Sequence, residues 1–404
     1  MEHDFDRCLD RLHATDLEFA SGSLDGLSNH GPMAAEALVQ LGHGDRVEPF
    51  LDAYVARLRP RPPGRPIGER TSKPPHRRTD GRAAARMDER AAARADERAA
   101  ALGDVSRAGD WIATWERELE ARPWQDVLRE AIPTLSDGVL ASALHGFLRV
   151  AHATRSLERA DTPSRRRELA HGLALWSARH QRLPGEPGRA PVPGHDAAAV
   201  FAALPRLDVP RRGLIFERLK VLEHEPAFAA AIDAWDASTF QLDGFVRAAA
   251  ALGAAGVLGV PGSRIALVHV VTGASALRLV APHLAPADTR RLAGHLLQAA
   301  AALWAVYGAP VRVSGAAPDA AAPDAAAPDV AAPDAAAPGA AVPGVAAPGA
   351  AAPDAAVPDP ATLRQRARSS MDDHAIKLTE AALREHALAP APLLLRAAAT
   401  LLEG

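Results

Sequence analysis

Alanine dominates this sequence, and that bias constrains the fold more than any other feature. Alanine is the strongest helix former, whereas aromatic residues, which favour strands, make up only 4% of the chain. Apolar residues also recur at helical spacing, as in residues 1–22 and at Trp111, Trp115 and Leu119. We therefore predict an all-α fold, a single large helical domain with two low-complexity insertions.

Both insertions differ from the rest of the chain in composition. Residues 60–103 begin with a Pro/Arg-rich stretch and continue as a charged repeat of Arg, Ala, Asp and Glu, which predicts a solvated helix with ion pairs. Residues 314–360 repeat Ala-Ala-Pro-Asp, and because proline blocks helix and sheet they predict a disordered linker. The predicted helical core is therefore 1–59 and 104–313, completed by C-terminal helices in 361–404.

Charge and cysteine content exclude several classes of protein. A net charge of −3 predicts no nucleic-acid partner, and the single cysteine, Cys8, allows neither an intramolecular disulfide nor a thiolate metal cluster. The acidic N-terminus lacks the pattern of an export signal. The most membrane-like stretch, 293–311, contains histidine, glutamine and proline and is better interpreted as a buried helix. We expect a cytoplasmic protein without membrane contact.

Familiar enzyme motifs are missing from the sequence. It contains no P-loop, H-E-x-x-H, G-x-S-x-G or EF-hand loop. Glycines recur at every third position from 253 to 262, which is not the dinucleotide-binding spacing. The search for chemistry therefore turns to the histidines.

Two histidine-bearing segments in the first half of the chain are candidates. His30 follows a turn just before a predicted helix, where its direction is fixed, although a solvent-exposed turn histidine fits equally well. His145 and His152 lie seven residues apart on one face of an apolar stretch, 140–152, that predicts a helix. Gly146 beside them permits close packing. Two histidines on one buried face indicate a site.

Two further segments lie in the second half. His269 is in the middle of an apolar run, with Thr272 one helical turn later as a brace for the imidazole; alone, it is interpreted as a core histidine. His374 and Lys377 are three residues apart and share one face of a helix that begins after the linker. Asp373 beside them acts either as a helix cap or as an acceptor for an imidazole N–H, and capping is the favoured interpretation.

With these motifs combined, the chain resembles the questin oxidase-like family outside its two insertions. The resemblance implies a helical non-haem iron oxygenase that uses Fe(II) and O2 to oxidise or open a ring of an anthraquinone-type aromatic polyketide. Four neutral imidazoles suit Fe(II), and a lysine can join them only as a carbamate, after its amine has lost a proton. The motifs that carry the resemblance are Asn29-His30-Gly31-Pro32-Met33, His145-Gly146, His269-x-x-Thr272 and His374-x-x-Lys377. The metal ligands that it implies are His30, His145, His269, His374 and a carboxylated Lys377.

Other residues of the site are assigned around these ligands. Lys377, Arg149 and Thr272 form the expected catalytic group. Arg149 stands where related sequences often carry histidine, so the inner wall of the site departs from the family there. His152 stands where they often carry tyrosine, and it is expected, like Asp373, to be an alternative ligand or to contact a ligand.

Two other functions remain open at this point. The same ligands with zinc would suit a metal-dependent hydrolase, and histidines that merely bridge a core would suit a helical binding protein for an aromatic ligand. Some family members use NADPH, but this sequence has no nicotinamide-binding fingerprint, which leaves a separate reductase or no reductant.

Overall fold

The structure is a computed structural model that describes residues 2–21, 24–68, 82–207, 209, 213–308 and 356–403. It is 72% helix, with 17 α-helices in the described residues, which confirms the all-α prediction. Most of the predicted linker, up to residue 355, and residues 69–81 of the first insertion lie outside the described residues.

The elements follow the chain in two groups. The first group is α1 (Glu2–His13), β1 (Glu18–Ser21), β2 (Leu24–Ser28), α2 (Gly31–Gln40), α3 (Val47–Val55), α4 (Arg82–Ala101), α5 (Ala108–Ala121), α6 (Trp124–Leu135), α7 (His145–Arg159) and α8 (Pro163–Ala178). The second group is α9 (Ala197–Ala203), α10 (Ile215–Arg218), α11 (Pro226–Asp233), α12 (Leu242–Gly259), α13 (Arg264–Val280), α14 (Pro286–Tyr307), α15 (Pro360–Ser369), α16 (Asp373–Leu388) and α17 (Pro392–Leu402).

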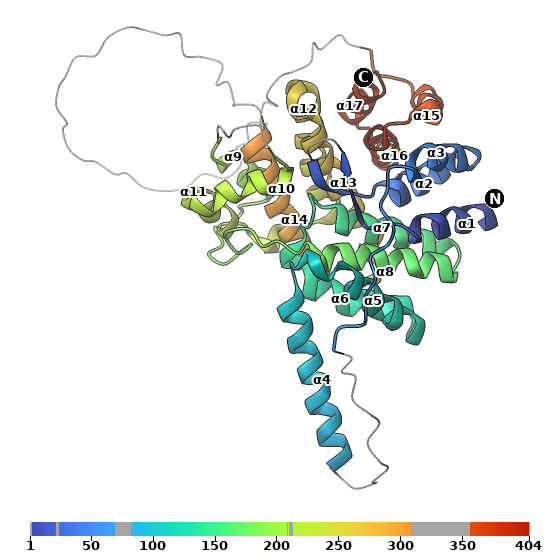
Figure 1. Ribbon diagram of the computed structural model, residues 1–404. Helices are drawn as coiled ribbons and strands as arrows, with labels where there is room; N and C mark the ends of the chain where they lie inside the picture. Colours follow the sequence, from blue (N-terminus) through green and yellow to red (C-terminus); the bar gives the residue numbers. More distant parts are fainter. Residues whose placement is uncertain are drawn as a thin grey trace, which may run out of the picture.

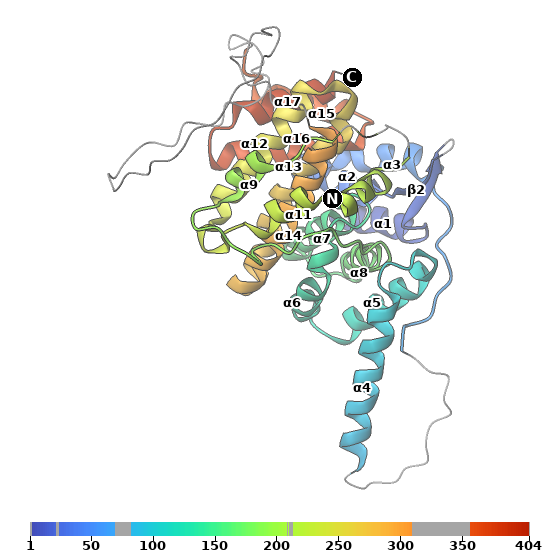
Figure 2. The same cartoon turned by 90° about the vertical axis from the view of Figure 1, so that its left-hand side faces the viewer.

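Four helices from distant parts of the chain form the centre of the molecule. Helix α2 packs against α7 and α16, and α13 packs against the same two helices, so the four close into a ring (Figures 1 and 2). The outer helices cover this ring: α8 lies on α7, α5 on α8, and α12 and α14 on α13. Although α16 follows the second insertion, it is a central element of the fold.

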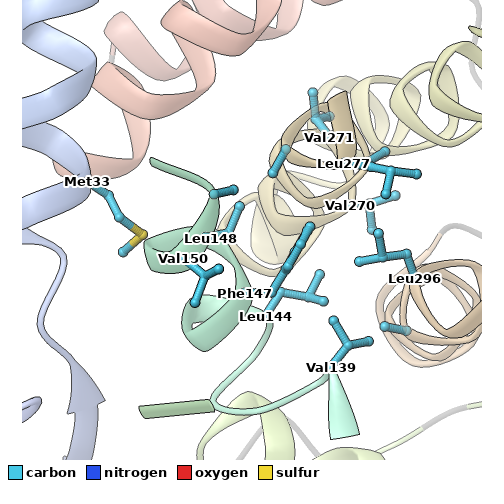
Figure 3. Packing of buried hydrophobic residues seen from close by; sticks show 14 of the residues in the cluster. Met33, Val139, Leu144, Phe147, Leu148, Val150, Val270, Val271, Leu277 and Leu296 are labelled. Atoms are coloured by element: carbon cyan, nitrogen blue, oxygen red, sulfur yellow. The ribbon is translucent and has the colours of Figure 1, made fainter. Parts of the chain in front are cut away.

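Apolar side chains fill the space between these helices. Figure 3 shows Met33 of α2, Leu148 of α7 and Val271 of α13 within one continuous core, and each of the three is at most 1% exposed. The predicted core residues Trp111 and Trp115 are also buried. Burial of this kind, at about 25 cal/mol per Å² of apolar surface, is the main force that holds short helices in place.

The N-terminal segment departs from the predicted helix. Helix α1 ends at His13, and β1 and β2 then form an antiparallel hairpin in which Glu18 lies opposite Ser28. The helical prediction through residue 22 was wrong because Leu17 and Phe19 are two residues apart, which is the period of a strand. The Thr15 hydroxyl donates to the Leu12 carbonyl at 2.6 Å and helps to terminate α1.

A second departure precedes α7, which begins only at His145. The predicted helix from residue 140 is interrupted because Ser142, Ala143 and Leu144 have positive φ angles of 51°, 57° and 71°. Side-chain-bearing residues rarely adopt this left-handed conformation, and nothing local in the sequence signals it.

Helix α4 extends away from the body of the molecule (Figures 1 and 2). From residue 92 onward, where its side chains are described, nearly all are exposed until Ala101, which is buried. This agrees with the solvated helix predicted for the charged repeat.

Two helical stretches are long and apolar enough, by length and composition alone, to cross a membrane. They are Leu242–Gly259 and Pro261–His283, of which 50% and 72% is buried within the protein. The stretch 293–311 that the sequence analysis considered is a different one. Its described residues lie in α14 or directly after it, and most of them are buried. Because both stretches pack in the ring or directly on it, the demands of the core account for their apolar character.

Candidate metal centre

Four histidines from the four central helices meet at one place. His30 is the N-cap of α2, His145 is the first residue of α7, His269 lies in α13 and His374 is the second residue of α16. The Nε2 atom of His145 lies 2.6 Å from Nε2 of His30 and 2.9 Å from Nε2 of His269. The His374 ring centroid is 4.7 Å from that of His30 and 5.4 Å from that of His269. The sequence prediction brought together these same four rings.

On three of the four rings, His30, His145 and His374, the opposite nitrogen Nδ1 faces an oxygen acceptor. His145 Nδ1 contacts the carbonyl oxygen of Ser142. A single oxygen, Oδ1 of Asp373, lies 2.8 Å from Nδ1 of His30 and 3.0 Å from Nδ1 of His374, as ion-pair contacts rather than fully aligned hydrogen bonds. A ring nitrogen that faces an oxygen carries the proton, so Nε2 of these rings is left with its lone pair.

With the protons on Nδ1, the Nε2 atoms of His30 and His145 face each other at 2.6 Å with a lone pair on each. Lone pairs this close repel unless a proton or a cation lies between them. Burial lowers the pKa of His30 to about 3, and burial followed by the charge of His30 lowers that of His145 far below its usual range, so a shared proton is disfavoured. A metal ion fits, because neighbouring nitrogens on one ion at bonds of about 2.0–2.1 Å are about 3 Å apart.

Lys377 lies one helical turn after His374, on the same face of α16. Its side chain is buried, and Nζ has no hydrogen-bond partner among the described residues. Its charge lowers the pKa of each of the four imidazoles. Burial lowers the pKa of Lys377 itself to about 8, against the opposing effect of Asp373 and Asp372. A buried amine of this kind can lose its proton and add CO2, with release of a second proton, to become a carbamate, which is an oxygen ligand.

The two neighbouring aspartates have different roles. Asp372 is the N-cap of α16 and accepts from the backbone N–H groups of His374 and Ala375 at 2.8 and 3.3 Å. Asp373 instead faces the imidazoles of His30 and His374. The structure therefore gives the favoured capping role to Asp372 alone. Burial and Lys377 lower the pKa of His374, but both aspartates outweigh them and leave that pKa raised.

One edge of the cluster reaches solvent. The side chains of His374 and Asp373 are each 15% exposed, whereas those of His145 and His269 are almost completely buried. A small ligand that enters without rearrangement of the core therefore approaches along the N-terminal end of α16.

Arg149, expected in the catalytic group, is engaged elsewhere. Its Nε and Nη2 atoms donate to the two carboxylate oxygens of Glu168 in α8, both at 2.8 Å. The same carboxylate contacts His13 Nε2 at 3.2 Å. Arg149 therefore belongs to a buried network between α1, α7 and α8, and the prediction that it lines the metal site has no support in its contacts.

Thr272 also has a different partner from the one expected. Its hydroxyl donates to the carbonyl of Val268 in its own helix at 3.1 Å and makes no hydrogen bond to His269. A helical threonine commonly bonds to the carbonyl four residues earlier, which is the reason that the bracing role does not arise. His269 Nδ1 itself has no partner among the described residues.

His152 lies two turns beyond His145 and contacts Glu36 rather than the other histidines, with Nδ1 at 2.7 Å from Oε2. Glu36 also accepts from Arg155 at 2.5 and 2.9 Å, and Arg155 continues to Glu380 at 2.5 Å. His152 is therefore not a ligand in this arrangement. It is part of a buried layer of charged residues, which we call the charged layer.

The charged layer connects the same four helices that supply the histidines. Because it lies later in sequence than the histidine on every one of them, the four helices run in the same direction, from the histidines to the charged layer. Sequence reasoning missed the charged layer because its members are scattered over the chain and become neighbours only in the fold. Its members are Glu36 in α2, His152 and Arg155 in α7, Ser275 and Arg278 in α13, and Glu380, Arg384 and Glu385 in α16.

Two more residues support His30, and the sequence analysis named only one of them, Asn29. The Tyr54 hydroxyl in α3 accepts from the backbone N–H of His30 at 2.6 Å, and Asn29 Oδ1 accepts from the N–H of Gly31 at 3.1 Å. Together they take the place of a side-chain cap on α2, since His30 at the N-cap position makes no such bond. Only the Asn29 contact is local enough to be read from the sequence.

A scan of protein-family models and a search of curated proteins found no match to this chain. The resemblance to the questin oxidase-like family therefore rests on the histidine and lysine motifs of the sequence.

Proposed function

We propose that this chain is a non-haem Fe(II) oxygenase of the questin oxidase-like kind, which uses O2 to oxidise or ring-open an anthraquinone-type aromatic substrate. The observation that supports it most is the pair of Nε2 contacts of 2.6 and 2.9 Å centred on His145, beside the unpartnered amine of Lys377. This arrangement is unfavourable without a cation and becomes favourable with one.

The proposed donor set favours iron over zinc. The residues that would hold the metal are His30, His145, His269, His374 and Lys377 as its carbamate. Structural zinc sites use four protein ligands and catalytic ones three, whereas five donors suit a metal of higher coordination number. Bound Fe(II) would supply the redox chemistry with O2.

The remaining task of the protein is to hold and shield this centre. Asp373 keeps a proton on Nδ1 of two rings, and the apolar neighbours of Lys377 on α16, Ile376 and Leu378, are completely buried. Such a site excludes water and strengthens the electrostatic contacts within it. We expect a cytoplasmic enzyme. The experiment below also asks whether it needs NADPH and a separate reductase.

Metal analysis of protein purified without a histidine tag tests the proposal. We expect one iron per chain, and O2 uptake on addition of one member of a panel of anthraquinones, measured with and without NADPH. Zinc in place of iron would instead support a hydrolase. Absence of bound metal from folded protein, after incubation with Fe(II) under anaerobic conditions, would contradict both and leave the helical binding protein.

Lys377→Ala tests the fifth ligand. We expect loss of iron and of O2 uptake with unchanged helical content, because a buried alanine is compatible with α16. Lys220→Ala, at an exposed lysine, is the matched control and should behave as the wild type. Incubation with ¹³C-labelled bicarbonate should give a carbamate NMR signal in metal-loaded or diamagnetic zinc-substituted wild type, and none in Lys377→Ala.

A further inference from the structure

The turn that precedes α7 is an outlier in backbone conformation. Ser142, Ala143 and Leu144 have φ angles of 51°, 57° and 71°, and they are the only non-glycine residues with positive φ among those the structure describes. Residues with a Cβ atom rarely occupy this left-handed region, and each of three such residues in succession adds its own energetic cost. Strain of this kind persists only where surrounding contacts impose it, often at functional sites.

The turn has a direct consequence for His145. In a helix continued from residue 140, the Ser142 carbonyl would point along the axis toward the N–H of Gly146. In the left-handed turn it points back at His145, where it contacts ring Nδ1 and also accepts from the backbone N–H at 3.3 Å. One carbonyl therefore fixes both the backbone and the ring of His145, and it directs Nε2 toward His30 and His269.

Contacts on two sides hold the turn in place. The Ser142 hydroxyl is 2.8 Å from the hydroxyl of Ser28, the last residue of β2 and two residues before His30. On the other side, the Leu144 side chain lies over Gly273 in α13, where an added Cβ would come within 2.9 Å of it. The turn is thus clamped between the segments that carry two of the other histidines.

We propose that the turn Ser142–Ala143–Leu144, clamped by Ser28, is a positioning element that holds His145 as the tautomer protonated at Nδ1, with Nε2 free for the metal. The inference rests on the proposed metal site only for its purpose, since the left-handed turn and the contact of its Ser142 carbonyl with His145 Nδ1 belong to the chain itself. Ser28 and Ser142 are positioning residues, because they act on the metal through His145.

Nuclear magnetic resonance of metal-free protein labelled with ¹⁵N in histidine tests the tautomer. We expect the wild type to show His145 protonated at Nδ1. Ser142→Ala and Ser28→Ala, which each remove the clamp, should raise the fraction protonated at Nε2 and weaken Co(II) binding roughly 10- to 100-fold. Ser136→Ala is the matched control, since it removes another buried hydroxyl, bonded to the carbonyl of Ile132.

Thermal unfolding of metal-free protein tests the strain separately. Ala143→Gly should raise the melting temperature, because glycine adopts a φ of 57° without penalty. Ala141→Gly, a buried alanine of the same loop without positive φ, should lower it. A decrease of similar size in both variants would overturn the claim that the turn is strained.

The outcomes separate this inference from the proposed function. If the wild type binds no metal but its His145 tautomer shifts in Ser142→Ala and Ser28→Ala, the positioning role stands and the oxygenase proposal fails. If both variants fold and bind Co(II) as tightly as the wild type, with the same tautomer, the positioning role is overturned while the metal site stands. Because Ser28 is outside the turn, Ser28→Ala decides the matter should Ser142→Ala fail to fold.

Discussion

Asp373 shows how much one side chain contributes to this site. Its Oδ1 atom serves two rings from two helices, His30 on α2 and His374 on α16. Burial by itself would raise the pKa of Asp373, but the charge and contact of His30, together with those of His374, hold it well below its usual range. The carboxylate is therefore ionised at neutral pH and keeps the Nδ1 protons of both rings toward itself, which leaves their Nε2 lone pairs free for the proposed metal.

Asp373→Asn should weaken metal binding about 10- to 100-fold, because the amide is neutral and offers each ring either an oxygen or an N–H group. The measurement is a competition for Co(II) or Fe(II) with a chromophoric chelator. Asp359→Asn, at the N-cap of α15, is the matched control, since asparagine caps a helix as well as aspartate and the binding should not change. Equal affinity in both variants would show that Asp373 does not orient the rings.

At the scale of elements, the placement of His145 depends on how closely α7 approaches α8. A Cβ atom on Gly146 would lie 2.6 Å from Cα of Trp176, and 2.8 Å from its backbone nitrogen, which is closer than such atoms come. The glycine therefore sets the distance between the two helices. This agrees with the prediction that Gly146 permits close packing beside His145.

Gly146→Ala should destabilise the protein by about 1–3 kcal/mol and reduce metal binding, since the backbone of Trp176 cannot yield without moving α7 and His145 with it. Urea denaturation followed by circular dichroism measures the first effect and chelator competition the second. Gly44→Ala, where an added Cβ meets nothing within 4 Å, is the control and should remain within about 0.5 kcal/mol of the wild type. A stable Gly146→Ala protein with full metal content would show that α7 and α8 can separate freely.

Elements also show what the sequence could and could not predict. Helices with clear signals were placed well: α2 has Pro32 in its first turn and Gly42 after its end. The start of α16 was also predicted, although Asp372 rather than Asp373 caps it. The turn at Ser142 escaped prediction because its cause is a contact with Ser28, more than a hundred residues away.

The same limit applies to the site residues. Helical spacing showed that His145 and His152 share a face. It did not show that His145 meets His30 whereas His152 meets Glu36, because the spacing carries no information about the neighbouring helix. The spacing did not show the partner of Arg149 for the same reason, since Glu168 is brought to it by the packing of α8. The motifs that resemble those of a family named the four histidines whose rings the fold brings together, which periodicity alone did not.

For the molecule as a whole, two polar layers stabilise one ring of helices. The four central helices run in parallel from the histidines to the charged layer, so the positive ends of α2, α7 and α16 lie at the metal centre. These ends favour negative charge there, which suits the carboxylate of Asp373 and a carbamate on Lys377. The charged layer holds the other part of the ring with buried ion pairs, and breaking one of them leaves an uncompensated charge inside the protein.

Two buried carboxylates should make the fold sensitive to acid: Glu36 in the charged layer and Glu168 beside Arg149. Burial by itself would raise the pKa of Glu36, but Arg155 and His152 outweigh it and lower that pKa to about 2; Arg149 and His13 do the same for Glu168. Each folded-state pKa lies below the unfolded value of about 4.3, so each group stabilises the fold above that pH, by on the order of 3 kcal/mol, and the stabilisation is lost as pH falls toward 2.

The free energy of unfolding of metal-free protein should therefore fall steeply between about pH 4.5 and 2, as measured by urea denaturation at a series of pH values. Glu36→Gln should be less stable than the wild type at pH 7 and should lose less on acidification, because its side chain no longer takes up a proton. Glu120→Gln, at an exposed carboxylate, should follow the wild-type curve. If the Glu36→Gln and wild-type curves run parallel through this range, the charged layer does not hold the ring together by charge.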